Sequence, residues 1–176
     1  MPEQASVEIE KTLVKIYALF LMDVDQKKDY ELITALCFLD DCLEYGTDSL
    51  FNMVKQQALP KLTEILEKRG SDNQDLVQNC IYGMGILAQR IPAAEFAGST
   101  ESVLKSVQWV IEQDFKTDEE DGAKQHECVD NAISTLGKVI YFHGNIPAQV
   151  VNVFLSKLPI STDTEEAQAA HLLLIN

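Results

Sequence analysis

The sequence predicts an all-α fold built from paired helices, and three observations support this prediction. Apolar residues recur at helical spacing along most of the 176-residue chain, whereas the alternation typical of strands is nearly absent. The expected helices are joined by short connections. Alternate helices also share a sequence pattern, which is typical of a repeat protein.

Eight helices are expected, separated by glycine, proline or acidic residues. Gly46 and Gly70 each end a helix, and Pro60 is expected to bend or divide the third one. The segments 92–100 and 117–122 are expected to be loops, the second of them an acidic one. The approximate helical ranges are 3–24, 30–45, 48–68, 73–90, 101–115, 124–142, 147–159 and a last helix from 163 to the end.

Polar residues at the expected helix starts are suitable N-caps, because their side chains can accept hydrogen bonds from unpaired backbone N–H groups. Asp48 or Ser49 can cap the third helix, and the segment 71–73 offers caps for the fourth. Asp163 can cap the last helix. In the helix at 30–45, we expect Leu32, Leu36, Leu39 and Leu43 to share one buried face.

The charge of the chain argues against some classes of partner. The chain has 28 acidic and 14 basic residues, a formal charge of −14, and 46% of its residues are hydrophobic. Nucleic acids and anionic membranes attract the opposite charge, so neither is expected as a partner. An acidic surface favours basic protein partners or simply keeps the chain in solution. The longest apolar stretch, 16–22, is too short to span a membrane, and no leader segment is visible, so an intracellular location is expected.

No residue pattern typical of an enzyme or a metal site is present. Cys37, Cys42, Cys80 and Cys128 form no CxxC pair and lie in helical apolar patterns, so we expect buried, reduced thiols. The three histidines are far apart, and His126 is too close to Cys128 for good zinc geometry. We therefore expect no catalytic residues, no cofactor and no metal.

Three of the expected helices align without a gap. They are TALCFLDDCL (34–43), NCIYGMGILA (79–88) and NAISTLGKVI (131–140), whose starts are 45 and 52 residues apart. Helix pairs repeating at about 40 to 47 residues are typical of HEAT solenoids. We expect one right-handed HEAT-repeat α-solenoid over 1–176, with repeats at about 3–46, 48–91, 99–143 and 147–176. The apolar segment 171–176 suggests a truncated last repeat, and thus a fragment of a longer array.

The alignment also places an unusual pair of aspartates. Asp40 falls in the column of Gly85 and Gly137, beside the buried stripe, where it needs a donor or an uncrowded edge. Asp41 falls with Ile86 and Lys138, in a column expected to face away from the core. Adjacent residues on a helix point about 100° apart, so a catalytic pair of carboxylates is not expected.

These helices resemble those of a known family. ALCFLDDCLEYG (35–46), IYGMGILAQ (81–89) and VDNAISTLGKVIYF (129–142) look like the HEAT arrays of the importin-β (karyopherin-β) superfamily. They are most similar to the C-terminal repeats of the importin-4/importin-5 branch. The resemblance covers about residues 32–170.

The resemblance implies a nuclear transport receptor that shuttles between cytoplasm and nucleus through the nuclear pore. In that family, basic cargo proteins and the GTPase Ran in its GTP form bind the concave face, formed by the second helices of the pairs. The Phe-Gly repeats of nucleoporins insert between the first helices. The family needs no cofactor. Its best-known Ran sites lie near the N-terminus, so Ran binding is not assured for this segment.

Polar residues of the second helices are the expected partner-binding positions, since carboxylates and amides can bind Lys, Arg or a peptide backbone. The alternative is an ordinary solvated helix face. Trp109 is expected to pack between repeats rather than to bind Phe-Gly segments. A HEAT scaffold subunit that does not shuttle is the main alternative function, and a small helical enzyme is another. The expected binding residues are Asp41, Glu44, Asn79, Tyr82, Gln89, Glu127, Asn131 and Ser134.

Overall fold

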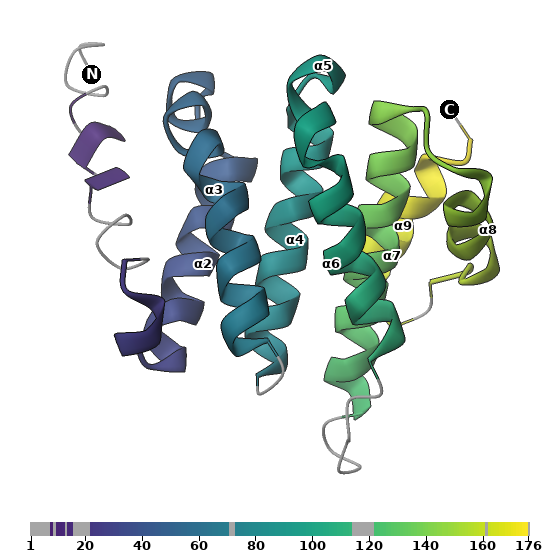
Figure 1. Cartoon of the computed structure of the whole chain (residues 1–176), viewed down its shortest axis with the longest axis horizontal. Helices are drawn as coiled ribbons and strands as arrows, with labels where there is room; N and C mark the ends of the chain where they lie inside the picture. The colour runs from purple at the N-terminus through teal and green to yellow at the C-terminus, as the bar shows by residue number, and fades with distance from the viewer. Residues whose placement is uncertain are drawn as a thin grey trace. The chain divides into compact units, whose positions relative to one another are not determined.

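The computed structural model consists of two compact units, unit 1 (Met1–Gly83) and unit 2 (Met84–Asn176). It describes residues 8, 10–12, 14, 15, 22–70, 73–113, 122–160 and 162–175, and of residues 122–126 only the backbone. Within these ranges every regular element is a helix, so the all-α prediction is confirmed (Figure 1). The boundary between the units falls within α4 (Gln74–Arg90), so 74–83 belong to unit 1 and 84–90 to unit 2.

Unit 1 is built around α2 (Asp29–Glu44) and α3 (Asp48–Arg69), which lie side by side (Figure 1). The apolar stripe expected on α2 is confirmed, because four leucines on it are 0% exposed. Burying one such side chain stabilises a fold by about 1.5–3 kcal/mol. The four residues are Leu32, Leu36, Leu39 and Leu43.

The start of α3 differs from the prediction. Thr47 is its N-cap, and its Oγ1 accepts a hydrogen bond from the Leu50 N–H, so neither Asp48 nor Ser49 caps the helix. Pro60 lies inside α3 without dividing it. Proline removes only one N–H group, and the buried residues on both sides of Pro60 hold the helix against the unit.

The expected bounds of α2 and α4 and the end of α3 are confirmed within a residue, whereas the first helix does not reach residue 24 as predicted, because residues 22 and 23 are not helical. Asn73 caps α4, since its Oδ1 accepts a hydrogen bond from the Leu76 N–H. Of the helix expected at 3–24, residues 8, 10–12, 14 and 15 are helical, and most of the others lie outside the described residues. The 3-10 turn η1 (Val24–Gln26) precedes α2, and Arg69 of α3 donates to the carbonyl oxygens of Val24 and Lys27.

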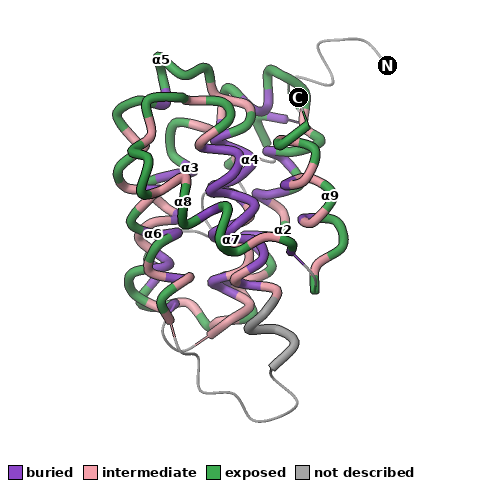
Figure 2. Tube along the Cα trace, turned by 90° about the vertical axis from the view of Figure 1, so that its right-hand side faces the viewer, coloured by how far each residue is buried: buried purple, intermediate pink, exposed green. Residues whose placement is uncertain are grey.

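Unit 2 is built around α7 (Gly122–His143), which packs against α6 (Thr100–Glu112), α8 (Ala148–Ser156) and α9 (Thr164–Leu172). Figure 2 shows buried residues in long stretches along α4 and α7, whereas much of α8 is exposed. The core of unit 2 therefore lies along α7.

The segment expected to be a loop at 92–100 is mostly helical. It contains α5 (Ala93–Phe96) and the 3-10 helix η2 (Ala97–Ser99). Phe96 is 1% exposed and stacks on His143 of α7, with ring centroids 4.1 Å apart. This aromatic contact explains why the segment is folded against the unit.

Two further expectations concern the end of unit 2. Asp163 caps α9 as predicted, because its Oδ1 accepts hydrogen bonds from the N–H groups of Glu165 and Glu166. The last helix does not continue to the end of the chain, since α9 ends at Leu172 and a turn follows. The acidic segment 117–121 lies outside the described residues, and α7 already begins at Gly122.

Candidate protein-binding surfaces

The exposed sides of α2 and α4 form one surface in unit 1. Asp41 and Glu44 of α2 are exposed, and Asn79 and Tyr82 of α4 are half-buried. The Tyr82 hydroxyl donates to Glu44 Oε2 at 2.6 Å, and the Cys37 thiol donates to Asn79 Oδ1 at 3.2 Å. We call these five residues the acidic face. It brings together all four of the candidate residues predicted in this part of the chain.

Asp40 lies beneath the acidic face, between α2 and α4. It is 5% exposed, and neither carboxyl oxygen has a hydrogen-bond partner among the residues that the structure describes. Gly83 of α4 is so close that a Cβ there would overlap Asp40 Oδ1 and crowd Leu62 of α3. The alignment correctly placed Asp40 beside the buried stripe, but neither the expected donor nor the expected uncrowded edge is found in the described part of the chain.

The surroundings of Asp40 favour its neutral form. Burial raises the pKa of the Asp40 carboxyl well above its usual range, and the nearby charges of Asp41 and Glu44 raise this pKa further. Ionising an unpaired carboxyl in such a place costs several kcal/mol, roughly, so the proton is retained instead. The neutral form of the Asp40 carboxyl is therefore favoured in the folded chain.

The thiols of this unit are kept protonated as well. Burial raises the pKa of the Cys37 thiol, and Asp40 and Asp41 contribute to the increase. Burial raises the pKa of Cys42 to about 11, and it raises the pKa of Cys80 well above its usual range. None of the four cysteines forms a disulfide, but Cys37 is exposed, which contradicts the prediction that each thiol is buried. Because the thiolate is the nucleophile, these thiols have little reactivity at neutral pH.

Only part of the predicted binding set of unit 2 is accessible. Gln89 is exposed and Glu127 is half-buried, but Asn131 is 3% exposed and Ser134 is 0% exposed. Asn131 Nδ2 donates to the Glu127 carbonyl oxygen and to Asp163 Oδ2, just before α9. The prediction that Asn131 and Ser134 lie on an exposed face is therefore wrong. Residues around α9 pack on the side of α7 that the repeat pattern assigned to solvent.

A second set of polar contacts joins α7 to the start of α9. Asp130 Oδ2 accepts hydrogen bonds from the N–H groups of Thr162 and Asp163 at 3.0 and 2.9 Å. Lys138 Nζ lies 3.3 Å from Glu166 Oε2, and both side chains are 8% exposed. Lys138 and Ile86 are buried, so their predicted outward orientation is wrong, whereas Asp41 in the same column is exposed as predicted.

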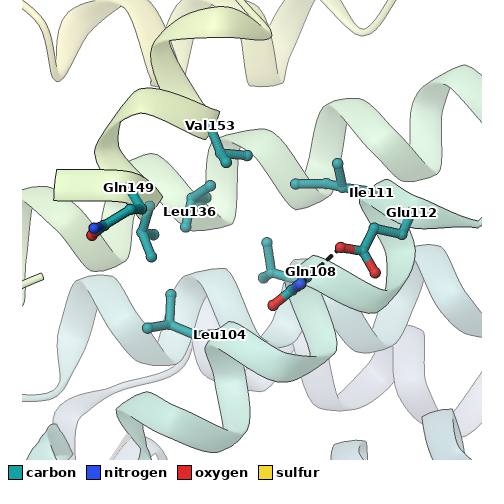
Figure 3. Close-up of a pocket in the computed structure, with 9 residues that line it drawn as sticks. Leu104, Gln108, Ile111, Glu112, Leu136, Gln149 and Val153 are labelled. Carbon is teal, nitrogen blue, oxygen red and sulfur yellow. Dashed lines mark hydrogen bonds between the residues drawn. The ribbon is translucent and has the colours of Figure 1, made fainter. Parts of the chain in front are cut away.

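A groove lies between α6 and α8 in unit 2, with α7 as its floor. Its volume is about 240 Å³. Leu104, Leu136 and Val153 point toward the same space, and the Gln108 amide donates to Glu112 Oε1 at its edge (Figure 3). The sequence contains no signal for this groove beyond the helical spacing of apolar residues. The complete lining is Leu104, Val107, Gln108, Ile111, Glu112, Leu136, Gln149, Val150 and Val153.

The remaining features of the described residues offer no further site. Trp109 is half-buried on α6 and is not among the residues that line the groove. His143 Nε2 lies 2.6 Å from the Ala88 carbonyl oxygen, and burial lowers the pKa of the His143 imidazole. Within the described ranges, no group of three or more His, Cys, Asp or Glu side chains is placed to hold a metal ion. None of the described helices is both long and apolar enough to cross a bilayer.

Comparisons with protein-family models, with curated proteins and with solved structures find no match to this chain. The fold class therefore rests on the structure itself. Unit 1 can offer hydrogen bonds and negative charge on its acidic face, and unit 2 can offer an apolar groove, to a partner that binds without covalent chemistry.

Proposed function

We propose that this chain is a HEAT-type segment of an importin-like nuclear transport receptor and that it binds basic segments of partner proteins. The observation that carries the proposal is the acidic face of unit 1. There, two exposed carboxylates lie beside an amide and a phenol that can also form hydrogen bonds with a peptide. The helix pairing, the repeat in the sequence and the net charge of −14 support the proposal.

Charge attraction would act first in such binding. Asp41 and Glu44 are one helical turn apart on α2, and both are exposed. A lysine or arginine near both carboxylates forms charge-assisted hydrogen bonds, which are stronger than neutral ones. Salt screens such exposed charges, so the affinity should fall as the ionic strength rises.

Fluorescence anisotropy of a labelled lysine- and arginine-rich peptide tests this proposal. Saturable binding to the full chain at low salt, weaker binding at physiological salt, and a loss of at least tenfold in Asp41→Lys are expected. Glu67→Lys is the matched control, because Glu67 is an exposed acid on α3, outside the acidic face. The proposal fails if the peptide does not bind, or if both variants weaken binding equally.

The groove of unit 2 favours a second candidate function, the binding of Phe-Gly segments of nucleoporins. Its floor and sides are mostly aliphatic, and its volume of about 240 Å³ is sufficient for an aromatic side chain. This property would separate a transport receptor from a HEAT scaffold that does not shuttle. Binding of the GTP form of Ran is not part of the proposal for this segment.

A Phe-Gly peptide distinguishes the two alternatives. Nuclear magnetic resonance (NMR) titration should shift signals of the groove residues, and Val153→Lys should abolish these shifts. Leu155→Lys is the control, because Leu155 is 49% exposed on the same helix but does not line the groove. Unchanged spectra in the wild-type chain would favour the scaffold.

A further inference from the structure

The position of Asp40 points to a property of the acidic face that its exposed residues alone do not have. On α2, residues 37, 40 and 44 share one side of the helix, because they are spaced by three and four. The contact of Cys37 with Asn79 lies near one end of this side, and the contact of Glu44 with Tyr82 lies near the other. The Asp40 carboxyl occupies the interval between these contacts, against Gly83.

Among the residues that the structure describes, the elements around this carboxyl supply no group that would neutralise its charge. On α2, the titratable neighbours are Cys37, Asp41 and Glu44, none of which is a cation. On α4, the neighbours are Gly83 and Cys80, whose thiol pKa Asp40 helps to raise. From α3, Leu62 reaches the same place. A buried carboxyl without a partner, beneath two exposed carboxylates, is therefore suited to respond to a positive charge from outside.

We propose that a cationic side chain of the partner, bound at Asp41 and Glu44, causes Asp40 to ionise, so that partner binding is coupled to the release of a proton to solvent. This inference rests on the proposed binding of basic segments at the acidic face. Asp40 changes from carboxylic acid to carboxylate, the proton goes to the buffer, and the lysine or arginine of the partner keeps its charge. The proton balance is complete without any other reactant.

The contacts that border the Asp40 carboxyl are open to a ligand. The two contacts that border the carboxyl, Glu44 with Tyr82 and Cys37 with Asn79, are both solvent-exposed. A cation that binds Glu44 competes directly with the Tyr82 hydroxyl for the Oε2 atom. An opposite charge within about 4–6 Å favours the ionised form of an acid. The same cation would thus strengthen its own binding by creating a third carboxylate beneath the two exposed ones.

Because proton release is thermodynamically linked to binding, the coupling can be measured as a pH dependence of the association constant. If one proton is released per peptide, the association constant rises with pH by up to about tenfold per pH unit. The increase occurs between the pKa of Asp40 in the complex and its higher pKa in the free chain. A purely exposed pair of carboxylates, already ionised at neutral pH, shows no such dependence there.

Isothermal titration calorimetry of the full chain tests the proposal. The probe is a lysine–glycine peptide with both ends blocked, so that its termini contribute no protons. Titrations at one neutral pH in phosphate and in Tris buffer, whose ionisation enthalpies differ, give the number of protons released. The proposal predicts a clear release in the wild-type chain and none in Asp40→Asn, which mimics the neutral acid.

Asp41→Asn is the matched control. It should weaken peptide binding severalfold but retain the proton release, because Asp40 is still present. Binding without proton release in the wild-type chain overturns this inference and leaves the proposed function intact. No binding at all overturns both. Release that persists in Asp40→Asn assigns the proton to another group and also overturns the inference. The inference stays falsifiable even if Asp40→Asn does not fold, because binding without proton release in the wild-type chain overturns it.

Discussion

Both units bury an ionisable side chain between helices, but they do so in opposite ways. In unit 1, Asp40 has no hydrogen-bond partner among the described residues, and burial raises the pKa of its carboxyl, which favours the neutral form. In unit 2, Lys138 and Glu166 are equally buried but lie 3.3 Å apart as an ion pair. A buried charge requires a partner, and a buried acid without one keeps its proton.

This difference has consequences for binding. In unit 2, Lys138 and Glu166 neutralise each other's charge. The pair therefore holds α9 against α7 and leaves little charge for a ligand to bind. Asp40 is unsatisfied and lies beneath an accessible surface, so an incoming cation can change its charge. The two regions therefore predict different responses to mutation, to added side-chain volume and to pH.

The largest expected effect concerns the ion pair. Lys138→Met leaves Glu166 buried without its cation and should destabilise unit 2 by about 3–5 kcal/mol. Trp109, the only tryptophan, lies in α6 of unit 2, so its fluorescence during urea unfolding reports on this unit. The double variant Lys138→Met/Glu166→Leu should recover most of the loss. If Lys138→Met is as stable as the wild-type chain, the ion pair does not stabilise unit 2.

The next largest effect concerns space rather than charge. Gly83→Ala places a methyl group against Asp40 Oδ1 and Leu62, and should destabilise unit 1 by about 1–3 kcal/mol. The helical signal in circular dichroism follows this loss during unfolding. Gly98→Ala is the control, because no atom lies within 4 Å of a Cβ at Gly98. Equal effects of the two substitutions would contradict the close packing around Asp40.

The neutral acid predicts a dependence of stability on pH. The pKa of Asp40 is raised in the folded chain, so folding favours the protonated form, and stability is lost as the pH rises from about 4 through the folded pKa. Asp40→Asn should remove this loss. Measured in urea at several pH values, the wild-type chain should become progressively less stable relative to the variant as the pH rises. Parallel pH profiles of the two proteins would refute the prediction.

A smaller effect of opposite sign is expected in unit 2. Burial lowers the pKa of His143 in the folded chain, so stability is lost as the pH falls below about 6.5, the value in an unfolded chain. His143→Phe retains an aromatic ring against Phe96 and cannot titrate. Trp109 fluorescence should show a smaller acid-induced shift of the urea midpoint in this variant. The explanation fails if both proteins shift equally.

The sequence predicted the helices of α2, α4 and α7 closely, because their apolar stripes repeat at helical spacing. It also named Asp41, Glu44, Asn79 and Tyr82 of the acidic face, because each is a polar residue on a helix expected to be the second of its pair. The sequence-based prediction failed where tertiary contacts determine which face of a helix is buried. A repeat pattern assigns the same orientation to every helix in a column, so it could not show that α9 and its preceding loop cover Asn131 and Lys138.

Other features depend on contacts between residues far apart in the chain. The segment expected to be a loop contains α5, because Phe96 stacks on His143, and no local sequence pattern reveals this contact. The groove between α6 and α8 is likewise invisible in sequence, since its lining residues look like ordinary core residues. Asp40 was placed beside the buried stripe by the alignment, but the absence of a hydrogen-bond partner among the described residues depends on how α2, α3 and α4 pack.

The most direct test of the contrast between the two regions is a carbon-13 NMR titration of the Asp40 carboxyl in the full chain, assigned by comparison with Asp40→Asn. A carboxyl resonance that remains in the protonated position at pH 7 and moves only at higher pH is the predicted result. A midpoint near 3.9, the ordinary value for aspartate, would contradict the account, because Asp40 would then already be charged and could not respond to a partner.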